Sequence, residues 1–189
     1  ILIVFVGMMY GFQIFVPIQL LYLNLITDSL PAISLAFENG SGNIMNREVR
    51  KNSNSFFTQF LILKMTFSSM LKAFATLMVY FVGIKLFSNH IAMTMAFLCL
   101  VMLEMIYAYS CKNLKVNVLE KKPFSNKILN IVTLILIMVQ ILVFATPVKK
   151  ILLIAPLNIW QVLYVFLMVL TVFLLDELSK NIFVKIFRD

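Results

Sequence analysis

Charged residues are scarce in this sequence. They make up 13% of the 189 residues, against about 25% in a typical soluble domain, and only eight of them are acidic. Apolar residues reach 62%, and the mean hydropathy is +0.99. A soluble fold of this length needs far more polar surface, so the composition excludes a soluble globular domain and predicts an integral membrane protein.

Cysteine is also rare, with Cys99 and Cys111 as the two thiols. They lie in and at the end of one apolar segment without zinc-type spacing, which argues against a disulfide framework or a metal site. We expect both to be packing residues. The five glycines and five prolines form no low-complexity tract, and the sequence has no internal repeat.

Long apolar runs make up most of the sequence. A helix needs about 20 apolar residues to cross a bilayer. We therefore predict an all-α fold, with residues 1–189 forming one polytopic transmembrane helix bundle of about six segments, at about 1–16, 17–37, 55–87, 91–111, 128–148 and 157–178. The first run begins at Ile1 inside an apolar stretch without signal-peptide features, so we expect the chain to be a piece of a longer protein.

Basic residues gather on one side of these predicted spans. Eleven of the sixteen fall in loops or a tail that share a side, namely Arg47, Arg50, Lys51, Lys112, Lys115, Lys121, Lys122, Lys127, Lys180, Lys185 and Arg188. The opposite side has Lys85, Lys149 and Lys150. The positive-inside rule therefore predicts a multi-pass protein of the cell membrane with a cytoplasmic C-terminus. The net charge of +8 follows from this asymmetry and from contact with anionic membrane lipid, and it suggests no nucleic-acid partner.

Polar residues interrupt the second predicted span, which contains Asn24, Thr27, Asp28 and Pro31. Offsets of three and four place the first three side chains on one face of an α-helix. Proline has no N–H, so the carbonyl of Thr27 loses its helical partner and we expect the helix to break. Oxygen atoms of these kinds are ligands of hard cations such as calcium. We interpret them as an intramembrane cation site.

A structural polar patch, with the proline as a mere kink, is the alternative for these residues. Polar contacts between membrane helices are worth about 1 kcal/mol or less on average. That amount compensates poorly for a carboxylate inside the membrane, so the cation site is the favoured interpretation.

Glu104 is the only acid in the fourth predicted span and should face the bundle interior. We interpret it as a second cation ligand; the alternatives are a protonated structural glutamate or one neutralised by Lys72. At helical rise Lys72 lies about 12 Å deeper in the membrane than Lys64. Snorkelling of its side chain is the favoured explanation, and a built-in positive charge that replaces one transported ion is the alternative.

Asp176 and Glu177 come at the end of the last predicted span, with Lys180 on the following turn. We expect an interfacial, salt-bridged helix end there and no transport ligand. His90 should be solvated at the outer edge of a span, and Trp160 suits an aromatic belt at the membrane surface.

The segment N-L-I-T-D-S-L-P-A, residues 24–32, resembles the sixth transmembrane helix of P-type cation-transporting ATPases. The calcium-pump branch has the pattern N-L-x-T-D-G-L-P-A, so Ser29 stands in place of a glycine. Weaker similarities follow in the family's order, with I-M-N-R-E-V-R at 44–50, L-E-M at 103–105, K-K-P-F-S-N-K at 121–127 and L-D-E at 175–177. The likeness covers essentially the whole chain, although Glu48 and Val49 replace two prolines of the family's cytoplasmic loop.

The resemblance implies that the chain is the end of the fifth helix plus helices six to ten of a calcium-pump-like ATPase. The family's cation ligands carry over onto Asn24, Thr27, Asp28 and Glu104. The sequence has no D-K-T-G-T phosphorylation motif and no nucleotide domain, so we expect no catalytic or cofactor-binding residue in this chain. ATP and Mg²⁺ would bind the missing cytoplasmic domains, which together with helices one to five would be its partners. The fragment alone would be inactive.

The function predicted from the sequence is therefore that of the membrane portion of an ATP-hydrolysing cation pump, with Ca²⁺ as the expected cargo. A sodium, potassium or proton pump of the same family is a rival, because the ligand types overlap. A self-contained small membrane channel or scaffold is a rival of a different class.

Overall fold

The computed structural model describes residues 1–38, 58–114, 116–118 and 123–186. Every regular element in these ranges is helical, which confirms the predicted all-α bundle. The elements are α1 (Leu2–Met9), α2 (Pro17–Tyr22), η1 (Leu23–Asp28), α3 (Ser29–Leu35), α4 (Gln59–Leu86), α5 (Asn89–Cys111), η2 (Pro123–Ser125), α6 (Lys127–Ala145), α7 (Val148–Ile151) and α8 (Ile159–Ile186). The segment 44–50 and the basic residues at 115, 121, 122 and 188 lie outside the described residues.

Five helical stretches of the described chain are long and apolar enough to cross a membrane: Pro17–Leu35, Gln59–Leu86, Asn89–Cys111, Lys127–Ala145 and Ile159–Ile186. The helix α1 is shorter than the first expected run, because the chain turns at Gly11, whose φ of 71° suits glycine. The helix α8 continues past the expected end near 178, and the polar residues there are buried against neighbouring helices.

Polar side chains begin three of these spans. Thr58, Ser88 and Asn126 each accept a hydrogen bond from the backbone N–H three residues further on, at 3.3, 3.4 and 2.9 Å. An N-terminal N–H has no partner inside its own helix, so such a cap stabilises the first turn. The starts of α4, α5 and α6 are therefore encoded locally.

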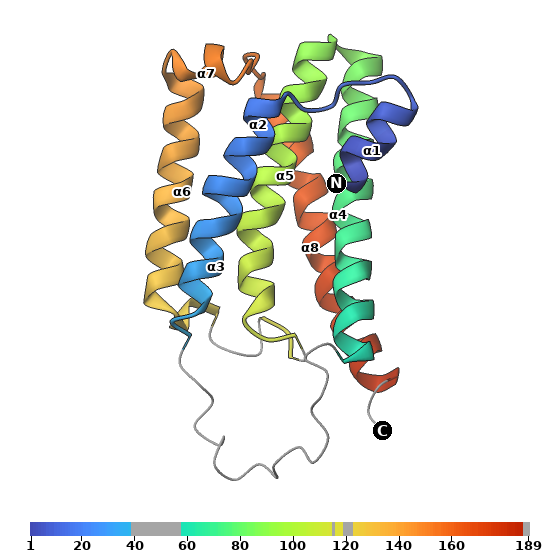
Figure 1. Ribbon diagram of the computed structural model, residues 1–189, viewed down its shortest axis with the longest axis vertical. Coiled ribbons are helices and arrows are strands. Elements are labelled where there is room, and N and C mark those ends of the chain that lie inside the picture. The colour runs from blue at the N-terminus through green and yellow to red at the C-terminus, as the bar shows by residue number, and fades with distance from the viewer. Residues whose placement is uncertain (39–57, 115, 119–122, 187–189) are drawn as a thin grey trace.

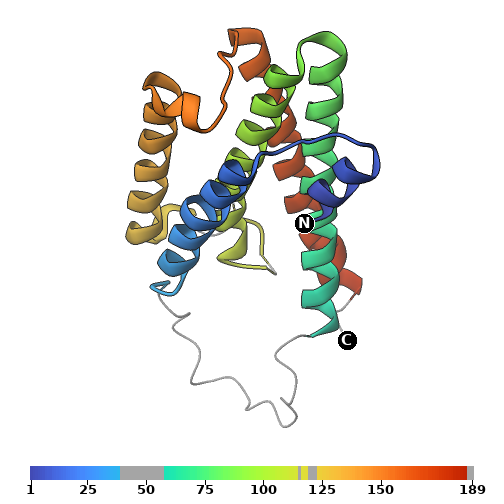
Figure 2. The same cartoon turned by 45° about the horizontal axis from the view of Figure 1, so that its top comes forward.

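The helices α4, α5 and α8 pack against one another and form the centre of the bundle (Figure 1). Of the five candidate spans, α5 is the most buried. The elements α2, η1 and α3 form one continuous rod beside α5, and α6 lies on the other side of that rod (Figure 2). This arrangement places the polar residues of η1 next to α5.

Small residues let α4 and α5 approach closely near their connecting turn. A methyl group added at Gly83 would lie 2.9 Å from Cα and 3.0 Å from Cβ of Ala92. Small residues at membrane helix interfaces allow such contact between backbones. The buried ring of Tyr80 belongs to the same hydrophobic core as Ala92, and its hydroxyl donates a hydrogen bond to Asn89 at 2.9 Å.

Gln19 joins α2 to the loop after α7. Its Nε2 donates to the carbonyl of Leu152 at 2.9 Å, and its Oε1 accepts from the N–H of Val16 at 3.2 Å. A second tie runs from the hydroxyl of Tyr22 to Oε1 of Gln140 on α6, at 3.0 Å. These bonds satisfy polar groups that would otherwise be costly to bury, and they hold the rod in place.

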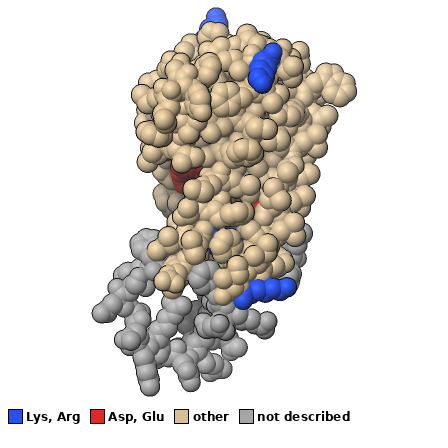
Figure 3. Space-filling view, turned by 90° about the vertical axis from the view of Figure 1, so that its right-hand side faces the viewer, with Lys and Arg blue, Asp and Glu red and all other residues tan. Residues whose placement is uncertain are grey.

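The outer surface is apolar between the two ends of the bundle. Large side chains of α6 and α8, such as Leu134, Ile141 and Phe166, are exposed. Figure 3 shows the face on the right-hand side of Figure 1, which is largely uncharged, with basic side chains near its ends and an acidic patch partway along it. Because acyl chains are as apolar as these side chains, this surface suits a multi-pass membrane protein.

Candidate cation-binding site

The polar residues of the second span lie on a π turn. The element η1, Leu23–Asp28, has the wider π geometry, and α3 continues directly through Pro31. The hydroxyls of Thr27 and Ser29 donate to the carbonyls of Leu23 and Asn24, at 2.7 and 2.8 Å. The helix was expected to break at Pro31, and this expectation is wrong. The chain stays helical through the proline, with a wider turn before it. The π turn ends at Asp28, and Pro31 lies inside the α-helix that follows it.

This wider turn changes which side chains share a face. Each residue of a π turn rotates by about 80°, in place of about 100° in an α-helix. An offset of four then keeps Asn24 and Asp28 together, while an offset of three turns Thr27 away from them. Thr27 is 1% exposed and is not among the residues lining the cavity that Asn24 and Asp28 share. The expectation of one face for all three residues assumed α-helical spacing.

A cavity of about 240 Å³ lies between α1, the α2–η1 rod, α4 and α5. Its polar lining is formed by Asn24, Asp28, Ser69, Lys72 and Glu104. Asp28 from the π turn and Glu104 from α5 are the two acids in this lining. Three of the four predicted ligands thus line one cavity, whose open side leaves Asn24 and Asp28 exposed.

Lys72 faces Glu104 in this cavity. Its Nζ lies 3.4 and 3.5 Å from the two carboxylate oxygens of Glu104, and 4.1 Å from the centre of the Tyr107 ring. The favoured expectation that Lys72 snorkels is therefore wrong. The alternative of a Glu104 neutralised by Lys72 describes the structure, because a cation inside a membrane protein is stabilised by an internal partner.

The chemistry of the cavity fits a hard cation, but the ligand set is incomplete. Calcium takes six to eight oxygen ligands. Asp28 and Glu104 offer carboxylate oxygens and Asn24 offers an amide oxygen, while the described residues contain no group of three His, Cys, Asp or Glu side chains placed to hold a metal. The chain can thus supply a part of a cation site.

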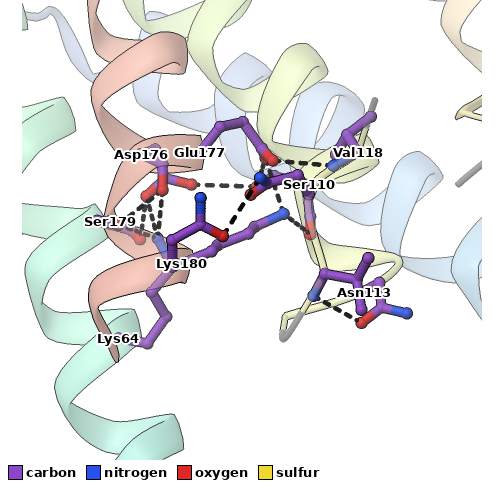
Figure 4. A network of polar contacts seen from close by, with 12 residues as sticks. Lys64, Ser110, Asn113, Val118, Asp176, Glu177, Ser179 and Lys180 are labelled. Atoms are coloured by element: carbon purple, nitrogen blue, oxygen red, sulfur yellow. Dashed lines mark hydrogen bonds and ion pairs between the residues drawn. The ribbon is translucent and has the colours of Figure 1, made fainter. Parts of the chain in front are cut away.

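A second group of charges lies at the end of the bundle where α8 approaches the C-terminus (Figure 4). We call it the α4–α5–α8 charge cluster, and it consists of Lys64, Ser68, Ser110, Asp176, Glu177, Ser179 and Lys180. All seven residues are buried. The expected ion pair between Glu177 and Lys180 is present, at 2.7 Å, and the helix end that carries it is buried against neighbouring helices.

Each charge of this cluster has a partner on another helix. Lys64 lies 2.7 Å from Asp176, the hydroxyl of Ser110 lies 2.6 Å from Glu177, and Lys180 donates to the carbonyl of Ser110 at 3.1 Å. Buried charges are tolerated when they are paired and hydrogen-bonded. The cluster therefore joins α4, α5 and α8, and it leaves Glu104 as the acid that Lys72 contacts.

Comparison with known proteins gives the family. The family described as "Cation transporting ATPase, C-terminus" matches residues 12–182. This chain belongs to that family. The resemblance found in the sequence is therefore confirmed, and the cavity lies in the membrane region of a P-type cation ATPase.

Relatives of this ATPase region are calcium pumps by name. This chain is 31% identical to "Calcium-transporting ATPase" of Bacillus subtilis over 113 residues, an alignment that covers 59% of this chain and 13% of that protein. It is 30% identical over 168 residues to "Calcium-transporting ATPase type 2C member 1" of Mus musculus, covering 87% of this chain and 18% of that protein. The chain thus spans less than a fifth of the length of these relatives.

Sequence reasoning missed the polar residues that support the charges of this ATPase region. It did not single out Ser69 in the cavity, or Ser68 and Ser110 in the charge cluster, because single serines are common in apolar helices. One signal was available: Lys64 and Asp176 are opposite charges at the same end of their predicted spans. Such charges are expected to pair inside a bundle.

Proposed function

We propose that this segment forms part of the intramembrane binding site of an ATP-driven pump that exports calcium. The observation that carries the proposal is the shared cavity, where Asn24 and Asp28 from the π turn face Glu104 from α5. Asp28 supplies the charge that binds the ion, Asn24 supplies a neutral oxygen, and Glu104 supplies a second carboxylate. Thr27 acts by holding the turn, since its hydroxyl donates to the carbonyl of Leu23.

The cost of placing these groups in the membrane supports a transport role. A carboxylate inside hydrocarbon is expensive and is found chiefly on ion pathways. Irregular helical turns at membrane depth recur in transporters, where the backbone faces the ion. In the full-length protein, phosphorylation of a distant aspartate would shift the bundle between inward-open and outward-open states. ATP and Mg²⁺ would bind in its cytoplasmic domains, and helices one to five would complete the cation site.

The distribution of charge supports a cytoplasmic C-terminus in the cell membrane. Lys112, Lys127 and Lys185 belong to the end of the bundle where α5 ends, α6 begins and α8 ends (Figure 1). Lys85, Lys149 and Lys150 belong to the opposite end. Positive residues are enriched on the cytoplasmic side of membrane proteins. The eleven basic residues that the sequence assigns to the side of the C-terminus outnumber these three, so that side is cytoplasmic.

Formation of a phosphoenzyme from ATP by the full-length protein tests this function. We expect calcium to support phosphorylation, and sodium and potassium to fail. The variant Asp28→Asn should lose the calcium dependence, while Glu38→Gln should keep it, because Glu38 pairs with Lys112 at the bundle end, away from the cavity.

Three results would contradict the proposal. An unchanged calcium dependence in Asp28→Asn would remove the site from the cavity. Phosphorylation driven by sodium, potassium or protons would identify the rival pump type. Absence of a phosphoenzyme with every cation, together with a start codon at the position of Ile1 in the gene, would favour a stand-alone channel or scaffold.

A further inference from the structure

Lys72 is the one cationic side chain among the described residues that lines the cavity shared by Asn24, Asp28 and Glu104. Its ammonium contacts both carboxylate oxygens of Glu104, and it lies over the ring of Tyr107. Both contacts attract a cation, and both partners are on α5. The charge of Lys72 is therefore held inside the bundle, at the wall of the proposed cation site.

This pair differs from the structural pair in the charge cluster. Lys64 and Asp176 lie 2.7 Å apart with side chains at most 7% exposed, and Lys64 also donates to Ser179 at 2.7 Å. Lys72 and Glu104 lie 3.4 Å apart, with side chains 15% and 23% exposed. The second pair is looser and opens onto the cavity, so the oxygens of Glu104 remain accessible from it.

On the side of Lys72 that faces away from Glu104, no acid among the described residues is left to pair with its ammonium. A cavity of about 10 Å³, room for about one water molecule, separates Lys72 from Asp176, and Ser68 and Ser110 also line it. Asp176 is already bonded to Lys64 and to both serines. The charge of Lys72 is therefore directed toward Glu104.

We propose that Lys72 is a tethered cation that takes the place of one transported ion beside Glu104, so that each cycle carries a single divalent cation, bound by Asp28 and Asn24 and facing the carboxylate of Glu104 that Lys72 also contacts. The inference rests on the proposed pump function. Of the two negative charges of Asp28 and Glu104, Lys72 balances one. A second divalent ion at Glu104 would stand against the ammonium at contact distance, where like charges repel strongly because the surroundings are apolar.

The number of calcium ions bound at equilibrium by the purified full-length protein, counted per phosphorylation site, tests this inference. We expect one ion in the wild type and one in Lys72→Arg, which keeps the charge. In Lys72→Met, which removes the charge and preserves the length, the ratio should rise above one toward two. The control Lys85→Met removes an exposed charge at the far end of the same helix and should stay at one.

A wild-type ratio of two would overturn the inference whatever the variants do, so the test does not depend on the folding of Lys72→Met. A ratio of one with unchanged affinity in both the wild type and Lys72→Met would also overturn it, because the pair would then be structural. A wild type that binds no calcium would instead refute the proposed cargo. The same count would then be made with the cation that supports phosphorylation.

Discussion

Lys64 on α4 places its ammonium 2.7 Å from a carboxylate oxygen of Asp176 on α8, and neither side chain is more than 7% exposed. The same ammonium donates to the backbone carbonyl of Asp176 at 2.9 Å and to the hydroxyl of Ser179 at 2.7 Å. An ammonium has three protons to donate, and these three bonds use all of them. Two helices far apart in the sequence are therefore joined by a saturated buried contact.

Removing one partner of this pair should destabilise the protein strongly. The variant Lys64→Met leaves the carboxylate of Asp176 buried without its cation, and breaking a buried pair in this way typically costs about 3–5 kcal/mol. We expect a clear fall in the thermal unfolding midpoint of the detergent-solubilised protein. The exposed Lys85→Met on the same helix should change it little. Equal midpoints for Lys64→Met and the wild type would show that the pair contributes nothing.

Replacing both partners should recover much of the loss. In the double variant Lys64→Met/Asp176→Leu no unpaired charge remains, and buried ion pairs can often be exchanged for apolar side chains without cost. The hydroxyls of Ser68 and Ser110 can turn to carbonyls of their own helices. We expect a midpoint above that of Lys64→Met, measured in the same detergent. A double variant less stable than Lys64→Met would show that the carboxylate serves a further purpose.

Calcium should stabilise the full-length protein through Asp28. A ligand that binds the folded state alone, at about 100 times its dissociation constant, adds about 2.7 kcal/mol of stability. We expect calcium to raise the unfolding midpoint of the wild type, and chelation to reverse the rise. Asp28→Asn should lose this response while Glu38→Gln keeps it. A calcium response that persists in Asp28→Asn would place binding elsewhere.

Enlarging Gly83 should separate α4 from α5. The added atoms of Gly83→Val would meet the backbone of Ala92, because even a single methyl would lie 2.9 Å from its Cα. Overpacking of a close contact costs about 1–3 kcal/mol. Thermal unfolding should show this loss, and Met78→Leu, at an exposed position of the same helix, should not. An unchanged midpoint in Gly83→Val would mean that the two helices can move apart freely.

Substitution of Gln19 should weaken the attachment of the rod. In Gln19→Leu the carbonyl of Leu152 loses its donor and the N–H of Val16 loses its acceptor. A buried polar group left unpaired costs about 1–3 kcal/mol. Thermal unfolding should detect this, with the exposed Leu21→Ala on the same helix as the control. Equal stability of Gln19→Leu and the wild type would contradict the role of this tie.

Much of the fold follows from local composition. The apolar runs predicted helical spans, and the all-α bundle agrees with them, because helix formation in a membrane depends on the length and hydropathy of each run. The expectations for two charged side chains within the spans did not foresee their partners. Snorkelling was expected for Lys72 and a pair with Lys180 for the acids at 176–177, but Lys72 contacts Glu104 and Asp176 contacts Lys64, each on another helix. A partner distant in the sequence leaves no local signal.

The candidate site was also predicted only in part from the sequence. The residue types at Asn24, Asp28 and Glu104 indicated oxygen ligands for a cation, and the resemblance placed them in one family. The rotation of Thr27 away from the cavity could not be predicted, because α-helical spacing was assumed and the chain forms a π turn there. Proline at position 31 signalled an irregularity but not its geometry.

The sequence by itself determined that this chain is a helical membrane protein of the cation-transporting ATPase family, with acids placed inside its spans, since hydropathy and motif are properties of neighbouring residues. The tertiary structure decided which of those acids are paired and which face a cavity. The physical reason is that the energy of a charge in apolar surroundings depends on atoms within a few ångströms in space, and helix packing brings those atoms from distant parts of the chain.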